Sequence, residues 1–213
     1  MSNLRGTVRL TGVAVRAMLV LTLLLGVGYT LAITGIGQLA LPWQSNGSLV
    51  DAKGNPTGGW TGGAAPVGSA LIGQSFADAN GEALPQYFQP RPSAAGKDGY
   101  DPTASGGSNL GPNNPDLVKT IAERRTAIAA REHVAESAIP ADAVTASASG
   151  LDPQISPAYA LLQVNRIADA RGLEASAVRA LVESRIQTRD VGFLGGPRVN
   201  VLQLNQALDS LGR

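Results

Sequence analysis

An uncharged apolar run near the N-terminus constrains this chain more than any other feature. Residues 17–40 read AMLVLTLLLGVGYTLAITGIGQLA, 24 residues without Asp, Glu, Lys or Arg. As an α-helix this run would reach about 36 Å, and the hydrocarbon core of a bilayer measures about 30 Å. A cleaved signal peptide also joins a basic start to an apolar run, but the run here is too long for one, and no convincing small-x-small cleavage site follows. We predict an uncleaved transmembrane helix over residues 17–40.

The charges around this run set its orientation. Arg5, Arg9 and Arg16 all precede it, and Asp51 is the first charged residue after it. Because basic residues favour the cytoplasmic side, we predict a cytoplasmic N-terminus over residues 1–16 and an outer location for the rest. In a bacterium this gives a single-pass protein of the inner (plasma) membrane with a periplasmic or extracellular domain. Trp43 follows the run and is either an interfacial anchor in lipid or an ordinary loop residue.

Composition limits the partners of the outer part. After the run, 14 Lys and Arg face 16 Asp and Glu, a net charge of about −2, which argues against nucleic acid or anionic lipid as the main partner. The chain has no cysteine, which excludes disulfides and thiolate metal sites. About 170 residues suffice for one hydrophobic core.

The outer part divides into a glycine-rich stretch and a folded domain. We predict a flexible segment over residues 41–68 and one outer domain over 69–213. The apolar run SALIGQSF (69–76) favours a strand. A helix is predicted from Asp116 until Pro140 closes it, with Leu117, Ile121 and Ile128 forming its apolar stripe. The opposite, solvent-facing side of this helix would hold Glu123, Arg124, Arg125, Arg131 and Glu132.

The second half of this domain has clearer signals for where helices start and end. Ser156 and Pro157 form a helix start, and Gly172 ends the helix AYALLQVNRIADAR. A shorter helix begins near Ser176, and the turn GFLGGP follows at residues 192–197. Asn200 is predicted to cap a last helix. The expected fold class is α+β, with one N-terminal transmembrane helix followed by a mixed, mainly helical outer-face domain.

Signatures of catalysis are weak, and we predict neither catalytic nor metal-binding residues. No Lys stands in the frame of a Walker loop, GxxxxGK followed by Ser or Thr. His133 is the single histidine and falls on the polar side of a predicted helix, where a solvated role is the ordinary one. Asp101, Asp142 and Asp152 occupy turn-like contexts, where capping is the usual use of a carboxylate.

Several longer peptides together resemble one family. The chain is similar to the C subunit of the bacterial high-affinity potassium-transporting P-type ATPase, the Kdp complex. The resemblance runs in order from the membrane helix through the following peptides: GSALIGQSF, YFQPRPSA, SGGSNLGPNNP, IPADAVTASASGLDPQISPAYALLQVNRIADARGL and GFLGGPRVNVLQLNQALD. Two departures are local: Gly196 stands where the family usually has Glu, and Ile186 where it usually has Thr.

The resemblance implies a non-catalytic accessory subunit. Its implied partners are a channel-like potassium-translocating subunit, a P-type subunit that hydrolyses ATP, a small fourth membrane subunit, and membrane lipid. The family is also described as a catalytic chaperone that raises the pump's affinity for ATP, so ATP is an implied ligand, with its binding residues unknown. Our predicted topology conflicts with direct nucleotide contact, because ATP and the outer domain lie on opposite faces. The alternative function is an unrelated membrane-anchored outer-face enzyme of the envelope.

Three segments supply candidate interface residues. In the membrane run, small residues permit close approach of helices. In SGGSNLGPNNP, glycines and asparagines would shape a loop, with Asn109 and Asn113 capping its turns, which is either a docking surface or only a connection from strand to helix. In GFLGGPRVN, Phe193 and Leu194 would meet either the core or a partner. The predicted partner-interface residues are Gly28, Gly35, Ser105, Gly106, Gly107, Ser108, Asn109, Phe193, Leu194, Arg198 and Asn200.

Overall fold

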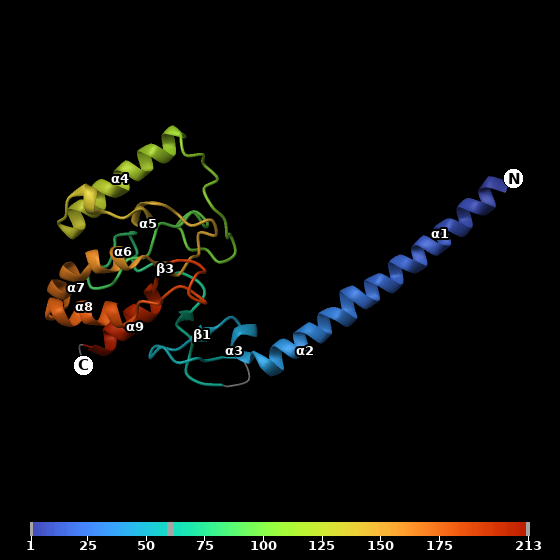
Figure 1. The fold of residues 1–213 in the computed structure, drawn as a ribbon, viewed down its shortest axis with the longest axis horizontal. Helices are drawn as coiled ribbons and strands as arrows, with labels where there is room; N and C mark the ends of the chain where they lie inside the picture. Colours follow the sequence, from blue (N-terminus) through green and yellow to red (C-terminus); the bar gives the residue numbers. More distant parts are fainter. Residues whose placement is uncertain (1, 59–61, 212–213) are drawn as a thin grey trace.

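The computed structural model describes residues 2–58 and 62–211 and begins with one long helix (Figure 1). Its parts are α1 (Ser2–Leu21), the π-helix η1 (Thr22–Tyr29) and α2 (Thr30–Ala40). Residues Gly6–Ala40 are long and apolar enough to cross a membrane, and none of the apolar window is buried against the rest of the protein. The structure therefore contains one helix that could span a membrane within the described residues, and the predicted run 17–40 lies within it.

The π-helix widens the middle of this membrane helix. Gly26 and Gly28 both lie in η1, where i to i+5 hydrogen bonds replace the α-helical pattern. The Thr30 hydroxyl donates to the carbonyl oxygen of Leu25 at 3.4 Å, five residues back. The backbone thus departs from the regular α-helix around two glycines of the membrane run.

Part of the glycine-rich segment is ordered, which differs from the predicted flexibility. It contains α3 (Pro42–Ser45) and the strand β1 (Leu49–Val50), which pairs antiparallel with β2 (Gly68–Ser69). Val50 is buried and packs with Ala70 and Leu202. These apolar contacts hold the start of the segment against the domain, although its composition is typical of a linker. Residues 59–61 of the segment lie outside the described residues.

The predicted strand over residues 69–76 is wrong beyond its first residue. After β2 the backbone turns, and Leu71 is 64% exposed. The backbone N–H of Gly73 donates to the Leu151 carbonyl at 2.7 Å, so this stretch is held by a loop contact instead of a ladder. An apolar run marks a buried strand only when it is covered, and Leu71 and Ile72 are exposed.

Helix α4 (Pro115–Glu132) begins as predicted but ends earlier. The Asn114 side-chain oxygen caps it by accepting from the N–H groups of Asp116 and Leu117. His133 takes a left-handed conformation and ends the helix well before Pro140, and its side chain is exposed. Two short helices then follow, η3 (Glu136–Ala138) and α5 (Ala141–Val144).

The C-terminal half consists of helices around a small sheet. Its elements are β3 (Gln154–Ile155), α6 (Pro157–Leu162), α7 (Val164–Arg171), α8 (Ala175–Ser184), β4 (Val199–Asn200) and α9 (Val201–Leu211). β3 and β4 pair antiparallel, with Ile155 opposite Val199. Ser156 and Asn200 cap helices as predicted. The helix predicted over residues 158–171 is broken at Gln163, whose side chain is fully buried in the core.

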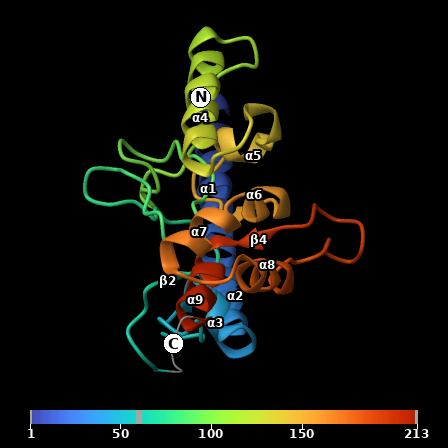
Figure 2. The ribbon, with the colours of Figure 1, turned by 90° about the vertical axis from the view of Figure 1, so that its left-hand side faces the viewer.

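One core unites the outer domain. Figure 2 shows α4 and α5 at one end and α7, α8 and α9 at the other. Tyr159, Ile167, Val182 and Leu204 are almost completely buried in a single cluster that Ile128 joins from α4. The predicted α+β, mainly helical domain with small sheets is confirmed.

Candidate partner interface

The SGGSN loop is held against a second loop, residues 147–150. The N–H of Gly106 donates to the Ser149 carbonyl at 2.9 Å, and the Ser105 hydroxyl donates to the same oxygen at 3.0 Å. At Gly107, an added Cβ would stand 3.1 Å from the carbonyl oxygen of Ala148. This close backbone approach explains the need for a glycine, and it gives the loop a defined shape.

Gly150 ends the second loop and is tightly enclosed. Its φ is +67°, and an added Cβ would stand 2.7 Å from the Ala95 nitrogen and 2.8 Å from the Gly106 carbonyl oxygen. Both the backbone conformation and the space therefore require glycine. The residue joins the SGGSN loop to the segment around Ala95, which is itself fully buried.

The outer edge of the SGGSN loop is exposed. Ser108 and Asn109 both face solvent, and Asn109 has a φ of +53°. The side chain that caps α4 at the end of this loop is that of Asn114, and the turn capping by Asn109 and Asn113 stays a prediction. In Figure 1 this loop runs along the side of the outer domain that is turned toward the membrane helix. Its polar edge and Leu110, 41% exposed, form the free surface.

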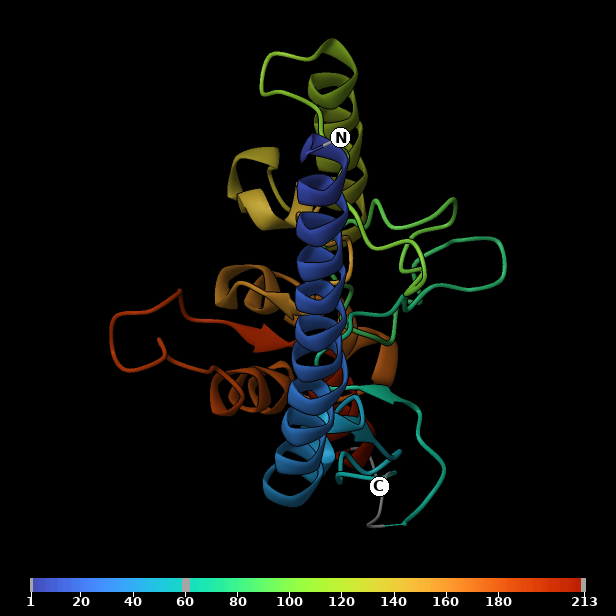
Figure 3. The same ribbon diagram turned by 90° about the vertical axis from the view of Figure 1, so that its right-hand side faces the viewer.

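The second predicted peptide forms a projecting hairpin, residues 187–198 (Figure 3). The Arg198 guanidinium donates to both carboxylate oxygens of Asp190, at 2.8 and 2.9 Å, and this pair closes the base. At the tip Phe193 is 71% exposed and Leu194 52% exposed. Of the two alternatives for these side chains, the structure excludes the core.

Asn200 differs from the other candidates because it is buried. Its Nδ2 donates to the Ala70 carbonyl at 2.8 Å, and its Oδ1 accepts from the N–H of Gln203. These bonds leave it 5% exposed, so it fastens α9 to the start of the domain and offers almost no surface to a partner.

An ion pair that we did not single out from the sequence lies between the two peptides. The Arg91 guanidinium contacts the Asp152 carboxylate at 2.9 Å. Both residues line two neighbouring hollows. One hollow, of about 840 Å³, extends to Pro197, and the other, of about 680 Å³, extends to Ser105. Arg91 comes from YFQPRPSA and Asp152 from GLDPQ, so both residues lie in peptides that carry the family resemblance.

The carboxylates considered for catalysis serve turns and helix starts. Asp142 accepts from the N–H and hydroxyl of Ser156, and Asp101 accepts from the N–H and hydroxyl of Thr103. The latter bonds lower the pKa of Asp101. Asp152 accepts from the N–H of Gln154 as well as from Arg91. Asp101 and Asp152 thus accept from residues two positions ahead, as turn-capping carboxylates do, whereas Asp142 lies in α5 and holds Ser156, the N-cap residue of α6.

The larger hollow does not fit a nucleoside triphosphate. Its cations are Arg91 and Arg198, and each is already paired with a carboxylate. Asp142, Asp152 and Asp190 line the same hollow, so three carboxylates offset two guanidinium groups. A triphosphate needs unpaired cations or converging backbone N–H groups, and this hollow is instead suited to polar and apolar protein side chains.

The glycines of the membrane helix have different surroundings. An added Cβ at Gly35 would meet nothing within 4 Å, and one at Gly28 would meet only the Leu23 carbonyl oxygen, at 3.6 Å. At Gly37 the Ser45 hydroxyl would lie 2.8 Å away. Gly37 therefore serves contacts within the protein, whereas Gly28 and Gly35 leave their surface open to another helix.

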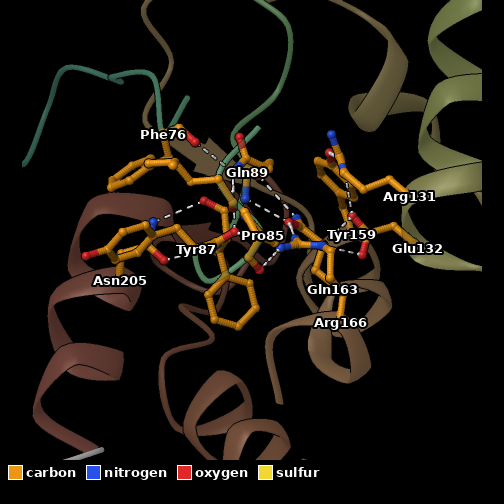
Figure 4. Close-up of polar contacts among 12 residues, drawn as sticks. Phe76, Pro85, Tyr87, Gln89, Arg131, Glu132, Tyr159, Gln163, Arg166 and Asn205 are labelled. Carbon is orange, nitrogen blue, oxygen red and sulfur yellow. Dashed lines mark hydrogen bonds and ion pairs between the residues drawn. The ribbon is translucent and has the colours of Figure 1, made fainter. Parts of the chain in front are cut away.

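A network of buried polar side chains links the YFQPRP segment to the surrounding helices (Figure 4). The Glu132 side chain, predicted to face solvent, is completely buried, and both Arg131 Nε, at 2.8 Å, and Arg166 Nε donate to it. Burial raises the pKa of Tyr159, whose hydroxyl accepts from Arg131. In the same region Gln163 donates to and accepts from the backbone of Gln89, and Asn205 does the same for Phe88. This network anchors the YFQPRP segment to α4, α7 and α9.

Comparison with known proteins identifies the family. The family model described as "K+-transporting ATPase, c chain" matches residues 11–210. The protein is 50% identical over 194 residues to the potassium-transporting ATPase KdpC subunit of Beijerinckia indica, covering 91% of this sequence and 90% of the relative. It is 47% identical to the KdpC subunit of Geobacter sulfurreducens, covering 93% and 96%, and 52% identical to that of Gemmatimonas aurantiaca, covering 90% and 87%. The chain belongs to the KdpC family and is an accessory subunit of a potassium-transporting ATPase, not an enzyme by itself.

Proposed function

We propose that this subunit assembles and stabilises a channel-like potassium-translocating subunit together with the P-type ATP-hydrolysing subunit, and a small fourth membrane subunit with them. The observation that supports this most directly is the placement of the SGGSN loop: it is exposed, rigidly backed by Gly150, and turned toward the membrane helix (Figure 1). A partner embedded in the same membrane would meet that side of the domain first. The hairpin tip supplies a second, apolar contact.

The orientation in the membrane is part of this proposal. With Arg9 and Arg16 on the cytoplasmic side, the outer domain lies in the periplasm or outside the cell. ATP is cytoplasmic, so the chaperone role described for the family would reach the pump's nucleotide site through subunit contacts. Direct ATP binding by this subunit is not needed for that role.

We expect protease added to intact spheroplasts to digest the part of the protein that follows about Trp43. The reason is that the outer domain would be accessible from outside, while the residues before the membrane run would be protected. Immunoblots against tags at either end measure this, and detergent-permeabilised cells provide the control. An outer domain that is protected in intact spheroplasts would contradict the topology.

We expect the double substitution Gly28→Leu and Gly35→Leu to reduce co-purification of the channel-like subunit at least about tenfold, since small residues at a helix interface determine how closely backbones approach. Both glycines have room for a larger side chain within their own protein, so the outer domain should keep its circular dichroism spectrum. Affinity capture of the tagged subunit from detergent extracts measures the loss.

Gly12→Leu is the matched control, because Gly12 also has open surroundings but lies before the apolar run. It should leave capture unchanged. If the double variant co-purifies normally and supports growth at limiting potassium, the membrane helix is only a tether and docking resides in the outer loops.

A further inference from the structure

The membrane helix ends in a tight turn, and hydrogen bonds join the residues before this turn to those after it. After α2 the backbone turns at Leu41, and α3 folds back beside the last helical turn. Asn46 Nδ2 donates to the Gln38 side-chain oxygen at 2.9 Å and to the Pro42 carbonyl at 2.6 Å. Ser45 packs against Gly37, and a Cβ added at Gly37 would stand 2.8 Å from the Ser45 hydroxyl. Contacts from both sides of Leu41 therefore fix the direction in which the backbone leaves the helix.

Trp43 connects this turn to the core of the outer domain. Its indole N–H donates to the Leu49 carbonyl at 2.7 Å, and its own carbonyl accepts from the N–H of Ser48 at 3.0 Å. The ring packs against the cluster of Val50, Ala70 and Leu202, and Leu202 belongs to α9. The sequence left Trp43 as either an interfacial anchor or a loop residue, and its indole hydrogen bond and part of its ring are used inside the protein.

We infer that Trp43 and these neighbours form a rigid elbow, so that the membrane helix and the outer domain bind one partner through a single composite surface. The inference rests on the proposed function and specifies its geometry. The partner must present a helix to the open side of Gly35 inside the bilayer and also rise above the membrane to meet the SGGSN loop. An integral membrane protein with an extended outer face fits this description.

Rigidity matters because the two contacts then reinforce one another. When two contact sites are held at the spacing that the partner requires, engagement of the first presents the second at a high effective concentration. A flexible connection would dilute that effect, although both contact surfaces would be unchanged. We therefore expect a change in the elbow to lower the affinity for the partner, even though it alters neither the membrane-helix surface nor the SGGSN loop.

The first experiment measures the elbow in the subunit alone. Because the sequence has no native cysteine, Leu31→Cys in α2 and Arg179→Cys in α8 can carry the only two spin labels. Double electron–electron resonance in nanodiscs should give one narrow distance distribution. Insertion of Gly-Ser-Gly between Leu41 and Pro42 should broaden it, and so should Trp43→Ala, with Trp43→Phe less affected because it keeps the ring packing. A broad distribution in the otherwise unaltered protein would overturn the inference without touching the proposed function.

The second experiment measures partner capture by the insertion variant. We expect about a tenfold loss of the channel-like subunit from detergent extracts. The same three residues inserted after Gly81, in an exposed turn with open surroundings, should change nothing. If the elbow insertion broadens the distances but leaves capture intact while the Gly28 and Gly35 substitutions abolish it, the composite surface is wrong and the proposed function stands.

Discussion

Replacing Glu132 with Ala is expected to destabilise the outer domain by about 3–5 kcal/mol, the cost of breaking a buried ion pair from one side. The Glu132 side chain is fully buried, and Arg166, with a side chain only 8% exposed, contacts it at 2.9 Å. Removing the carboxylate would leave the Arg166 guanidinium without its counter-charge inside the domain. Urea unfolding of the full-length protein in detergent, followed by near-ultraviolet circular dichroism, measures the change.

Glu123→Ala is the matched control on the same helix. Glu123 is 64% exposed and lies 3.8 Å from Lys119, so its loss should cost no more than about 0.5 kcal/mol. Glu132→Gln tests the charge alone, because it keeps the shape and a hydrogen-bond acceptor. Equal effects of the Glu132 and Glu123 truncations would show that the buried network does not hold α4 in place.

Gly150→Ala is expected to cost about 3 kcal/mol and to weaken capture of the partner subunits as well. The new methyl group would combine a left-handed backbone with close approaches to Ala95 and Gly106, and each effect is worth about 1–3 kcal/mol. Because Gly106 would be pushed away, the SGGSN loop would lose its shape. Thermal unfolding measures the first effect, and affinity capture measures the second.

Gly172→Ala separates the two sources of strain. Gly172 has a similar φ of +62° but open surroundings, so this substitution should cost only about 1 kcal/mol and leave capture unchanged. If Gly150→Ala behaves like Gly172→Ala in both assays, the close approach beneath the SGGSN loop is unimportant.

Local sequence signals predicted the frame of the fold well. The membrane run, the Ser156 and Asn200 caps and the left-handed Gly172 all follow from interactions within a few residues, which a sequence displays directly. The start of α8 was equally clear, since the helix begins at Ala175, one residue before the predicted Ser176. Local rules succeed where the partner of a group is its near neighbour in the sequence.

The sequence was misleading where a distant partner decides burial. Glu132 and Gln163 are polar by type, yet both are buried because groups far along the sequence satisfy them. Helical periodicity placed Glu132 on a solvent face that α7 covers. Conversely, Leu71 belongs to an apolar run but stays exposed because no strand covers it. A sequence pattern over a few residues carries no information about contacts between residues this far apart.

The candidate interface shows the same division. The SGGSN loop and the GFLGGP turn were predicted from their turn residues, and both lie on the surface of the domain. The Arg91 to Asp152 pair between them was not predicted, because its members stand 61 residues apart. The packing of Trp43 against Val50, Ala70 and Leu202 was not predicted, since a tryptophan after a membrane helix gives no indication of the residues that it contacts.

The amide contacts to Phe88 and Gln89 also bear on the order of folding during synthesis. The side chains that bind these backbone groups belong to residues 117 and 74 positions further along the sequence. While the protein is being synthesised, the YFQPRP segment emerges long before Asn205 does. The backbone groups of this segment therefore stay without their native partners until the last helix has been made. A protein shortened before α9 would leave the ribosome with an intact membrane helix and no folded domain for it to support.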